Sequence, residues 1–78
     1  MRLRFFGRLR DTIGEREIDV VLPPEIVNSD QLRAWLGHRH PAVLDKSVRI
    51  ALDDRIVAGV ETVRNADEAA FLPPVSGG

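Results

Sequence analysis

Residues 28–36 read Asn28-Ser29-Asp30-Gln31-Leu32-Arg33-Ala34-Trp35-Leu36, and this stretch decides the fold class. Leu32, Trp35 and Leu36 repeat at intervals of three and four residues, which places them on one face of a helix. Asn28 or the residue after it can cap the first turn. Pro41 ends the helix at about residue 40, because the residue before a proline is pushed out of helical geometry. The sequence predicts only this one long helix.

Apolar and polar residues alternate on both sides of this helix, which is the period of half-buried strands. The predicted strands cover residues 2–6, 17–22, 47–52, 56–57 and 68–72. A short helical segment over residues 9–13 joins the first two strands, and the first and last strands are expected to lie side by side. We therefore predict an α+β fold of the β-grasp kind, with a mixed four- to five-stranded sheet packed on one main helix.

Length and composition restrict the classes of function. The chain has 78 residues, a formal net charge of -1 and no cysteine. A near-neutral chain is not expected to bind nucleic acid or an anionic membrane, and one this small rarely encloses a deep catalytic cavity. The lack of cysteine excludes thiolate nucleophiles and cysteine-ligated metals. Without a membrane-spanning stretch or a signal-peptide core, the chain is expected in the cytoplasm.

Two polar groups resemble ligand sites but lack the required spacing. His38 and His40 are two residues apart, whereas helical ligand pairs lie three or four apart, so both are expected at a solvated helix end. Asp53 and Asp54 stand between two predicted strands, where adjacent acidic residues are ordinary turn formers. We expect no metal site and no bound cofactor.

The end of the sequence differs in character from the rest. Residues 1–72 are expected to form the β-grasp domain, and residues 73–78 an extended tail, Pro73-Pro74-Val75-Ser76-Gly77-Gly78. Six extended residues reach at most about 20 Å. The prolines keep the chain extended, and the glycines remove the last side chains, as threading into a narrow channel requires. The carboxylate of Gly78 is then the predicted reactive group.

Docking such a tail needs a surface beside its root. By alternation, Phe6 and Leu72 point to the solvent side of neighbouring strands, and Ile56 is expected to join them. Apolar side chains gathered on a surface are typical of a binding anchor. Arg10 is a further predicted contact, with an acidic partner. The alternative is that another part of this chain covers these side chains.

Two motifs resemble the small-subunit family of molybdopterin synthase. They are Phe5-Phe6-Gly7-Arg8-Leu9-Arg10-Asp11 and Asp67-Glu68-Ala69-Ala70-Phe71-Leu72-Pro73-Pro74-Val75-Ser76-Gly77-Gly78. The resemblance covers essentially the whole chain and implies a ubiquitin-like β-grasp that carries sulfur for molybdenum cofactor biosynthesis. One departure is Asn65-Ala66, where many relatives have a glycine in the turn before the last strand. Asparagine tolerates a left-handed backbone, so the turn can survive.

The resemblance also implies partners. A ubiquitin-activating-type adenylating enzyme would use ATP to adenylate Gly78, and a sulfurtransferase would supply sulfur, which leaves a thiocarboxylate (1-thioglycine). The tail would then enter the large synthase subunit, in a heterotetramer, and donate sulfur to cyclic pyranopterin monophosphate. The catalytic residues are expected on the large subunit, so this chain would itself be non-catalytic.

Other functions stay open at this point. The chain could carry sulfur for thiamine, cysteine or thiolated tRNA, although Pro73-Pro74 argues against the thiamine branch, and a tungsten cofactor shares the pterin chemistry. It could also be a ubiquitin-like modifier joined through Gly78 to a target lysine. The remaining alternative is an interaction module whose Gly77-Gly78 ending is fortuitous.

Overall fold

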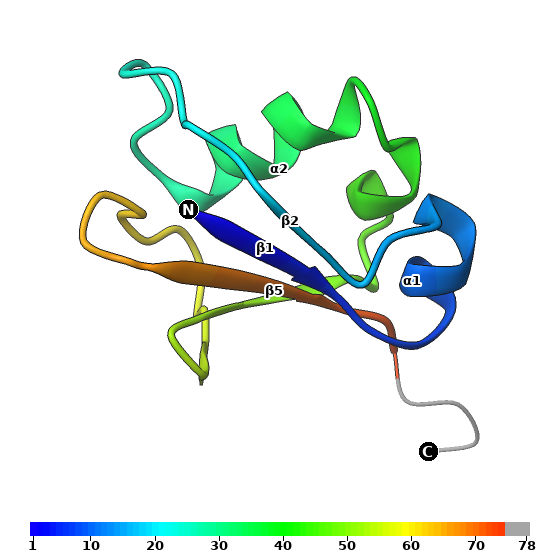
Figure 1. Ribbon diagram of the computed structural model, residues 1–78. Coiled ribbons are helices and arrows are strands. Elements are labelled where there is room, and N and C mark those ends of the chain that lie inside the picture. The colour runs from blue at the N-terminus through cyan, green and yellow to red at the C-terminus, as the bar shows by residue number, and fades with distance from the viewer. Residues whose placement is uncertain (75–78) are drawn as a thin grey trace.

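The computed structural model describes residues 1–74, which form a five-stranded sheet with a helix across one face (Figure 1). The elements in chain order are β1 (Arg2–Phe5), α1 (Gly7–Ile13), β2 (Glu17–Asp19), α2 (Ser29–Gly37), the 3-10 helix η1 (Pro41–Leu44), β3 (Arg49–Leu52), β4 (Arg55–Ile56) and β5 (Glu68–Leu72). The strand order is β2-β1-β5-β3-β4. β1 and β5 are parallel, and the other neighbours are antiparallel. The predicted α+β fold, a ubiquitin-like β-grasp, is confirmed.

The core lies between α2 and the central strands. Leu3 and Phe5 of β1 and Phe71 of β5 are at most 2% exposed, and Leu32 and Leu36 of α2 close over them. Alternation predicts that every second side chain of these strands faces inward, and this is confirmed for Leu3, Phe5 and Phe71. Burial of this apolar surface is the main force that holds the helix on the sheet.

Helix α2 begins where the sequence predicts and ends earlier. The Asn28 side chain accepts a hydrogen bond from the Gln31 amide at 2.8 Å, and the Gln31 side chain accepts one from the Asn28 amide at 3.2 Å. This capping box fixes the start of the helix. The helix ends at Gly37, and the chain continues as a turn in which the amides of Arg39 and His40 both bond to the Leu36 carbonyl. Leu44 of η1 occupies the space that a β-carbon at Gly37 would need, so only glycine fits there. The predicted end at about residue 40 is wrong by about one turn, and η1 was not predicted.

Strand β2 is shorter than the alternation predicts. It spans three residues rather than 17–22, and Ile18, Val20 and Leu22 are only half-buried. The reason is its position at the edge of the sheet, where one side has no neighbouring strand. The hydrogen-bonded pairing of this segment with β1 ends at Met1 and Val20, which exchange two backbone hydrogen bonds.

The acidic pair between β3 and β4 has the predicted role of turn formation. Asp53 and Asp54 both have left-handed backbones, with φ of 46° and 68°, as two-residue hairpin turns require. The Asp53 carboxylate also accepts hydrogen bonds from the amides of Asp67 and Glu68, both at 3.1 Å. Asn65 lies in a turn before β5, as expected, but neither Asn65 nor Ala66 has a left-handed backbone. None of the helices within residues 1–74 has the length and apolarity of a membrane span.

Candidate functional site

The root of the predicted tail is the end of the central strand β5. Phe71 is fully buried, and its carbonyl accepts a hydrogen bond from the Phe6 amide at 3.2 Å. Pro73 is half-buried and lies so close to Gly7 that a β-carbon there would be 2.9 Å from Pro73 Cγ. Gly7 also has a positive φ of 55°, which glycine adopts without strain. The chain therefore leaves the sheet at a defined place, beside the start of α1 (Figure 1).

The last predicted site residues lie beyond this point. Val75, Ser76, Gly77 and Gly78 are outside the described residues, so the tail and its reactive carboxylate remain predictions. Pro74 is exposed where the described chain ends.

The predicted anchor residues share the outer face of the sheet, opposite α2. Leu72 pairs with Arg49. Phe6 stands between β1 and α1, and its amide bonds to Phe71 of β5, so Phe6 and Leu72 both lie at the tail end of the sheet. Ile56 belongs to the next row across the sheet. That row runs through Arg4, Ala70, Ala51 and Ile56.

The outer face is more covered than the sequence predicts. Phe6 and Leu72 are half-buried, and only Ile56 is well exposed, at 46%. Two alanines, Ala51 and Ala70, separate Ile56 from Leu72, so the three side chains do not form one continuous exposed patch. These alanines were missed by sequence reasoning. Their outward positions on β3 and β5 follow from the same alternation and could have revealed them.

Charge is distributed unevenly along the outer face. Arg2 lies 3.1 Å from Glu17, and Arg4 lies 3.6 Å from Glu68, all toward the start of β5. The Arg4 guanidinium is also 5.0 Å from the centre of the Phe6 ring, a cation–π distance. Arg4 thus covers part of Phe6, and the ion pairs end there. The exposed Arg49, which pairs with Leu72, carries a charge at the tail end of this face without an ion pair within residues 1–74.

Charged residues also lie on the elements around the tail root. Arg10 is exposed on α1 and makes no ion pair within residues 1–74. Asp45 shares a shallow depression with Pro73 and Pro74. Hydrogen bonds from the Ser47 hydroxyl and amide lower the pKa of Asp45. Arg8 lines the same depression, which therefore contains both an acidic and a basic side chain.

The two histidines have different environments. His38 is exposed at the end of α2, as predicted. His40 is half-buried, and its ring lies 6.3 Å from that of Phe5, so the expectation that both are solvated is wrong for His40. The reason is that the turn after α2 folds His40 back toward the core. Among the described residues, no three His, Cys, Asp or Glu side chains form a group that could hold a metal ion.

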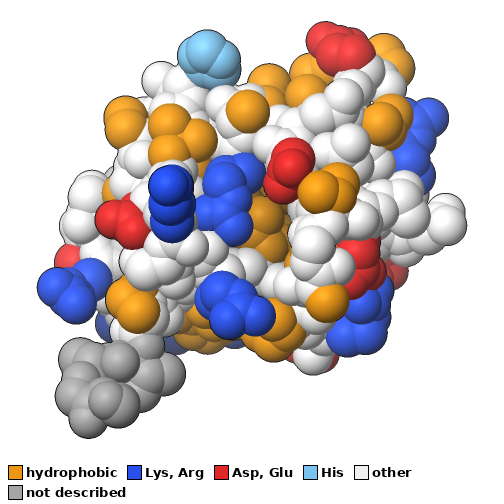
Figure 2. All heavy atoms as spheres, turned by 180° about the vertical axis from the view of Figure 1, so that it is seen from behind, with side chains coloured by type: hydrophobic (Ala, Val, Ile, Leu, Met, Phe, Trp, Pro, Cys, Tyr) orange, Lys and Arg blue, Asp and Glu red, His pale blue; other side chains and the backbone are white. Residues whose placement is uncertain are grey.

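The surface seen from behind Figure 1 mixes side chains of all kinds (Figure 2). Basic, acidic and hydrophobic groups alternate there over the described residues, without a large field of one sign. This agrees with the net charge of -1 and gives no indication of polyanion binding on that face.

Comparison with known proteins identifies the family. A model of the ThiS family matches residues 3–78, which includes the tail as well as the domain. The chain belongs to the ThiS family. A Haemophilus influenzae relative, named molybdopterin synthase sulfur carrier subunit, is 29% identical over 100% of this chain and 99% of its own. An Anopheles gambiae relative of the same name is 32% identical and is covered over 91% of its length.

Solved structures agree on the fold of this ThiS family member. The crystal structure of SAMP1 from Haloferax volcanii superposes with a TM-score of 0.77 and 23% identity, covering 99% of this chain and 97% of that one. An identity this low shows the fold alone. The family and the names of the two relatives support a sulfur-carrier role.

Proposed function

We propose that this chain is the sulfur-carrying small subunit of a molybdopterin synthase, with the sulfur held as a thiocarboxylate on Gly78. The observation that carries the proposal is the end of β5. A fully buried Phe71 anchors the strand, and the chain then turns out at Pro73-Pro74 ahead of Val75-Ser76-Gly77-Gly78. The family match that extends through residue 78 and the names of the two relatives support it.

The chemistry needs activation because a carboxylate is a poor electrophile. An adenylating partner transfers AMP from ATP to the Gly78 carboxylate and releases pyrophosphate. A sulfur donor then displaces AMP, so a carbon–sulfur bond replaces the carbon–oxygen bond to AMP. This explains how a chain without cysteine can carry sulfur.

The large subunit supplies the site of sulfur transfer. The thiocarboxylate is delivered to cyclic pyranopterin monophosphate, and each dithiolene product needs two sulfur atoms, so the spent carrier must leave and be reloaded. In this proposal the rigid root at β5 sets the direction of the tail, and Phe6, Leu72, Ile56 and Arg10 contact the partner. The reaction takes place in the cytoplasm, with the catalytic acids and bases on the partner.

A loading experiment tests the proposal. The full chain is incubated with the adenylating enzyme, ATP and a sulfur source, and its intact mass is measured. We expect a gain equal to one oxygen replaced by one sulfur. Gly78→Trp should abolish this gain and change stability by less than about 0.5 kcal/mol, because a surface substitution in a tail contributes little to folding.

The matched control is Val60→Trp, which places the same side chain at an exposed position away from the tail. It should load normally. Normal loading of Gly78→Trp would contradict the proposed carrier site. A ladder of larger conjugates, in place of the thiocarboxylate, would instead show a protein modifier.

A further inference from the structure

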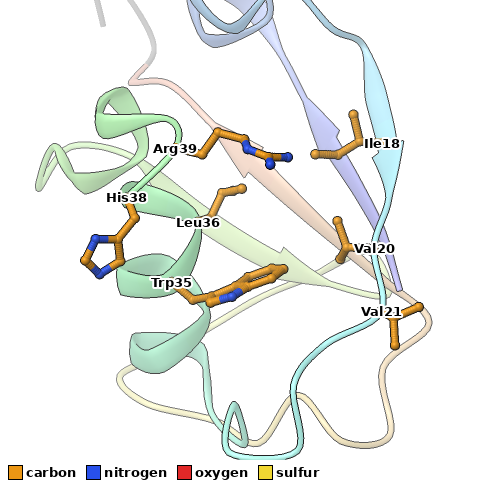
Figure 3. A pocket seen from close by; sticks show the side chains of 7 residues that line it. All are labelled: Ile18, Val20, Val21, Trp35, Leu36, His38 and Arg39. Atoms are coloured by element: carbon orange, nitrogen blue, oxygen red, sulfur yellow. The ribbon is translucent and has the colours of Figure 1, made fainter.

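A groove of about 350 Å³ lies between α2 and the segment that contains β2. Trp35 and Leu36 of the helix point toward the strand, where Ile18 and Val20 face them (Figure 3). Arg39 reaches across the end of the groove toward Ile18, and His38 turns away from it. The groove therefore has apolar walls and a basic rim.

The strand that forms one wall has an open edge. Val20 and Met1 exchange two backbone hydrogen bonds, and the Arg16 carbonyl accepts one from Phe5, so even-numbered residues of this segment face β1. In an antiparallel ladder the odd-numbered residues then direct their N–H and C=O groups to the other side. No strand of residues 1–74 pairs with that side of β2. Such an edge is a template for another extended chain.

Val21 stands out beside this edge. Its side chain is 93% exposed, the highest value among the large hydrophobic residues of the described chain. Its amide donates to no group within residues 1–74. An unpaired donor and an exposed valine next to an apolar groove are features of a surface that a partner covers.

We propose that this groove and the open edge of β2 bind an extended, apolar segment of a partner protein that carries an acidic side chain. The segment adds as a strand beside β2, so that its backbone pairs with residues 17, 19 and 21. Every second side chain then enters the groove, against Trp35 and Val20.

The positive charge of Arg39 is the reason to expect an acidic side chain on the bound segment. Arg39 is exposed and makes no ion pair within residues 1–74. No Asp or Glu lines the groove. Glu17 is directed to the opposite face of the sheet, where it pairs with Arg2. A carboxylate on the incoming segment would therefore meet a free guanidinium, with no competing anion at the groove.

Two other occupants fit these features less well. A helical peptide satisfies its own backbone groups, so it would leave the edge of β2 unpaired. A second copy of the chain could instead pair its β2 with this one in an antiparallel ladder. Pairing centred on Ile18 would then set Glu17 opposite the partner's Asp19, and pairing centred on Asp19 would set two aspartates opposite each other. Like charges directly opposite one another destabilise a sheet.

The groove is on the helix side of the sheet, whereas Phe6, Leu72 and Ile56 are on the outer face. The proposal therefore does not depend on the sulfur-carrier function. A partner in the groove would also leave the outer face and the root of the tail accessible, so both surfaces could be used together.

Selection from a displayed library of random dodecapeptides on the full-length chain tests the proposal. We expect enriched sequences in which apolar residues alternate and an Asp or Glu stands at one end. A synthetic peptide of the enriched sequence should bind about tenfold more weakly to Arg39→Glu, because a close charge pair becomes a repulsion. Lys46→Glu makes the same charge change outside the groove and should bind normally.

A second pair of variants tests the backbone contact. Val21→Pro removes the outward N–H, whereas Val21→Ser keeps it and shortens the side chain. The proline variant should lose more affinity than the serine variant, with circular dichroism confirming that both are folded. The proposal is wrong if no peptide family is enriched, or if the enriched peptide binds Arg39→Glu and Val21→Pro as well as the unchanged chain. It is also wrong if the groove instead mediates a dimer that Val21→Pro dissociates.

Discussion

The two faces of the sheet are formed by the same strands and have opposite properties. On the face under α2, Leu3 and Phe71 are completely buried. On the outer face, Phe6 and Leu72 are half-buried, and Ile56 is 46% exposed. Successive side chains of a strand point to opposite faces, so two adjacent residues of β5 belong to different environments.

The residues of the inner face stabilise the fold, whereas those of the outer face can contact a partner protein. The inner face is filled by large apolar side chains in contact with one another. The outer face combines two alanines, ion pairs and a few apolar side chains next to the tail. Surface ion pairs add little to stability, so residues of the outer face are free to serve a partner. The groove beside β2 is a second surface of this kind, on the other side of the sheet.

The largest predicted effect is on the inner face. Phe71→Ala should lower the free energy of unfolding by about 3–5 kcal/mol, because it leaves a large cavity in the core. Leu72→Ala, one residue away on the outer face, should cost about 1 kcal/mol or less. The half-buried Leu72 side chain shields less apolar surface from water than Phe71 does, so its removal loses less. Urea unfolding followed by the fluorescence of Trp35, the single tryptophan, measures both. Equal losses would mean that the outer face is packed as firmly as the inner one.

The next effect concerns binding rather than stability. If the outer face anchors a large synthase subunit, Phe6→Ala should weaken that complex by about 2 kcal/mol or more, the loss typical of an interface hot spot. Its cost to folding should be about 1 kcal/mol, because Phe6 is only partly buried. Calorimetric titration measures the affinity, with Val60→Ala as the control at a distant exposed site. Unchanged affinity would remove Phe6 from the predicted contacts.

The inner face could be predicted from the sequence because local rules decide it. Alternation alone places Leu3, Phe5 and Phe71 on the inward face, where they are buried. Side-chain chemistry offers Asn28 and Ser29 as caps of α2, and the structure uses Asn28. The end of α2 could not be predicted this way. The chain leaves the helix in a turn after Gly37, and Leu44 packs against Gly37 there, a tertiary contact that no local pattern indicates.

The candidate surfaces were predictable in part for the same reason. Alternation gave the face on which Phe6, Leu72 and Ile56 lie. Their separation depends on strand order and register, which place Ala51 and Ala70 between them, and neither can be obtained from local patterns. The groove was missed because the helical spacing of Trp35 indicated a core residue. Trp35 does pack against the core, but its outer edge also lines the groove.

The smallest predicted effect is a pH dependence that arises in a loop and leaves the inner face untouched. A hydrogen bond from Arg55, with a second from the Ala58 amide, lowers the pKa of Glu61. A carboxyl whose pKa is lower in the folded state stabilises the fold above its unfolded pKa, and this contribution is lost as the pH falls through the folded pKa. The advantage of the unchanged chain over Glu61→Gln in melting temperature should therefore be constant near neutral pH. It should decline only below about pH 4.3, the usual pKa of a glutamate.

The advantage is expected to be small, because Arg55 is largely exposed and its ion pair is screened. Glu25→Gln changes an exposed carboxyl without an ion pair in residues 1–74 and serves as the control. An advantage over Glu61→Gln that stays constant below about pH 4.3 would contradict this prediction.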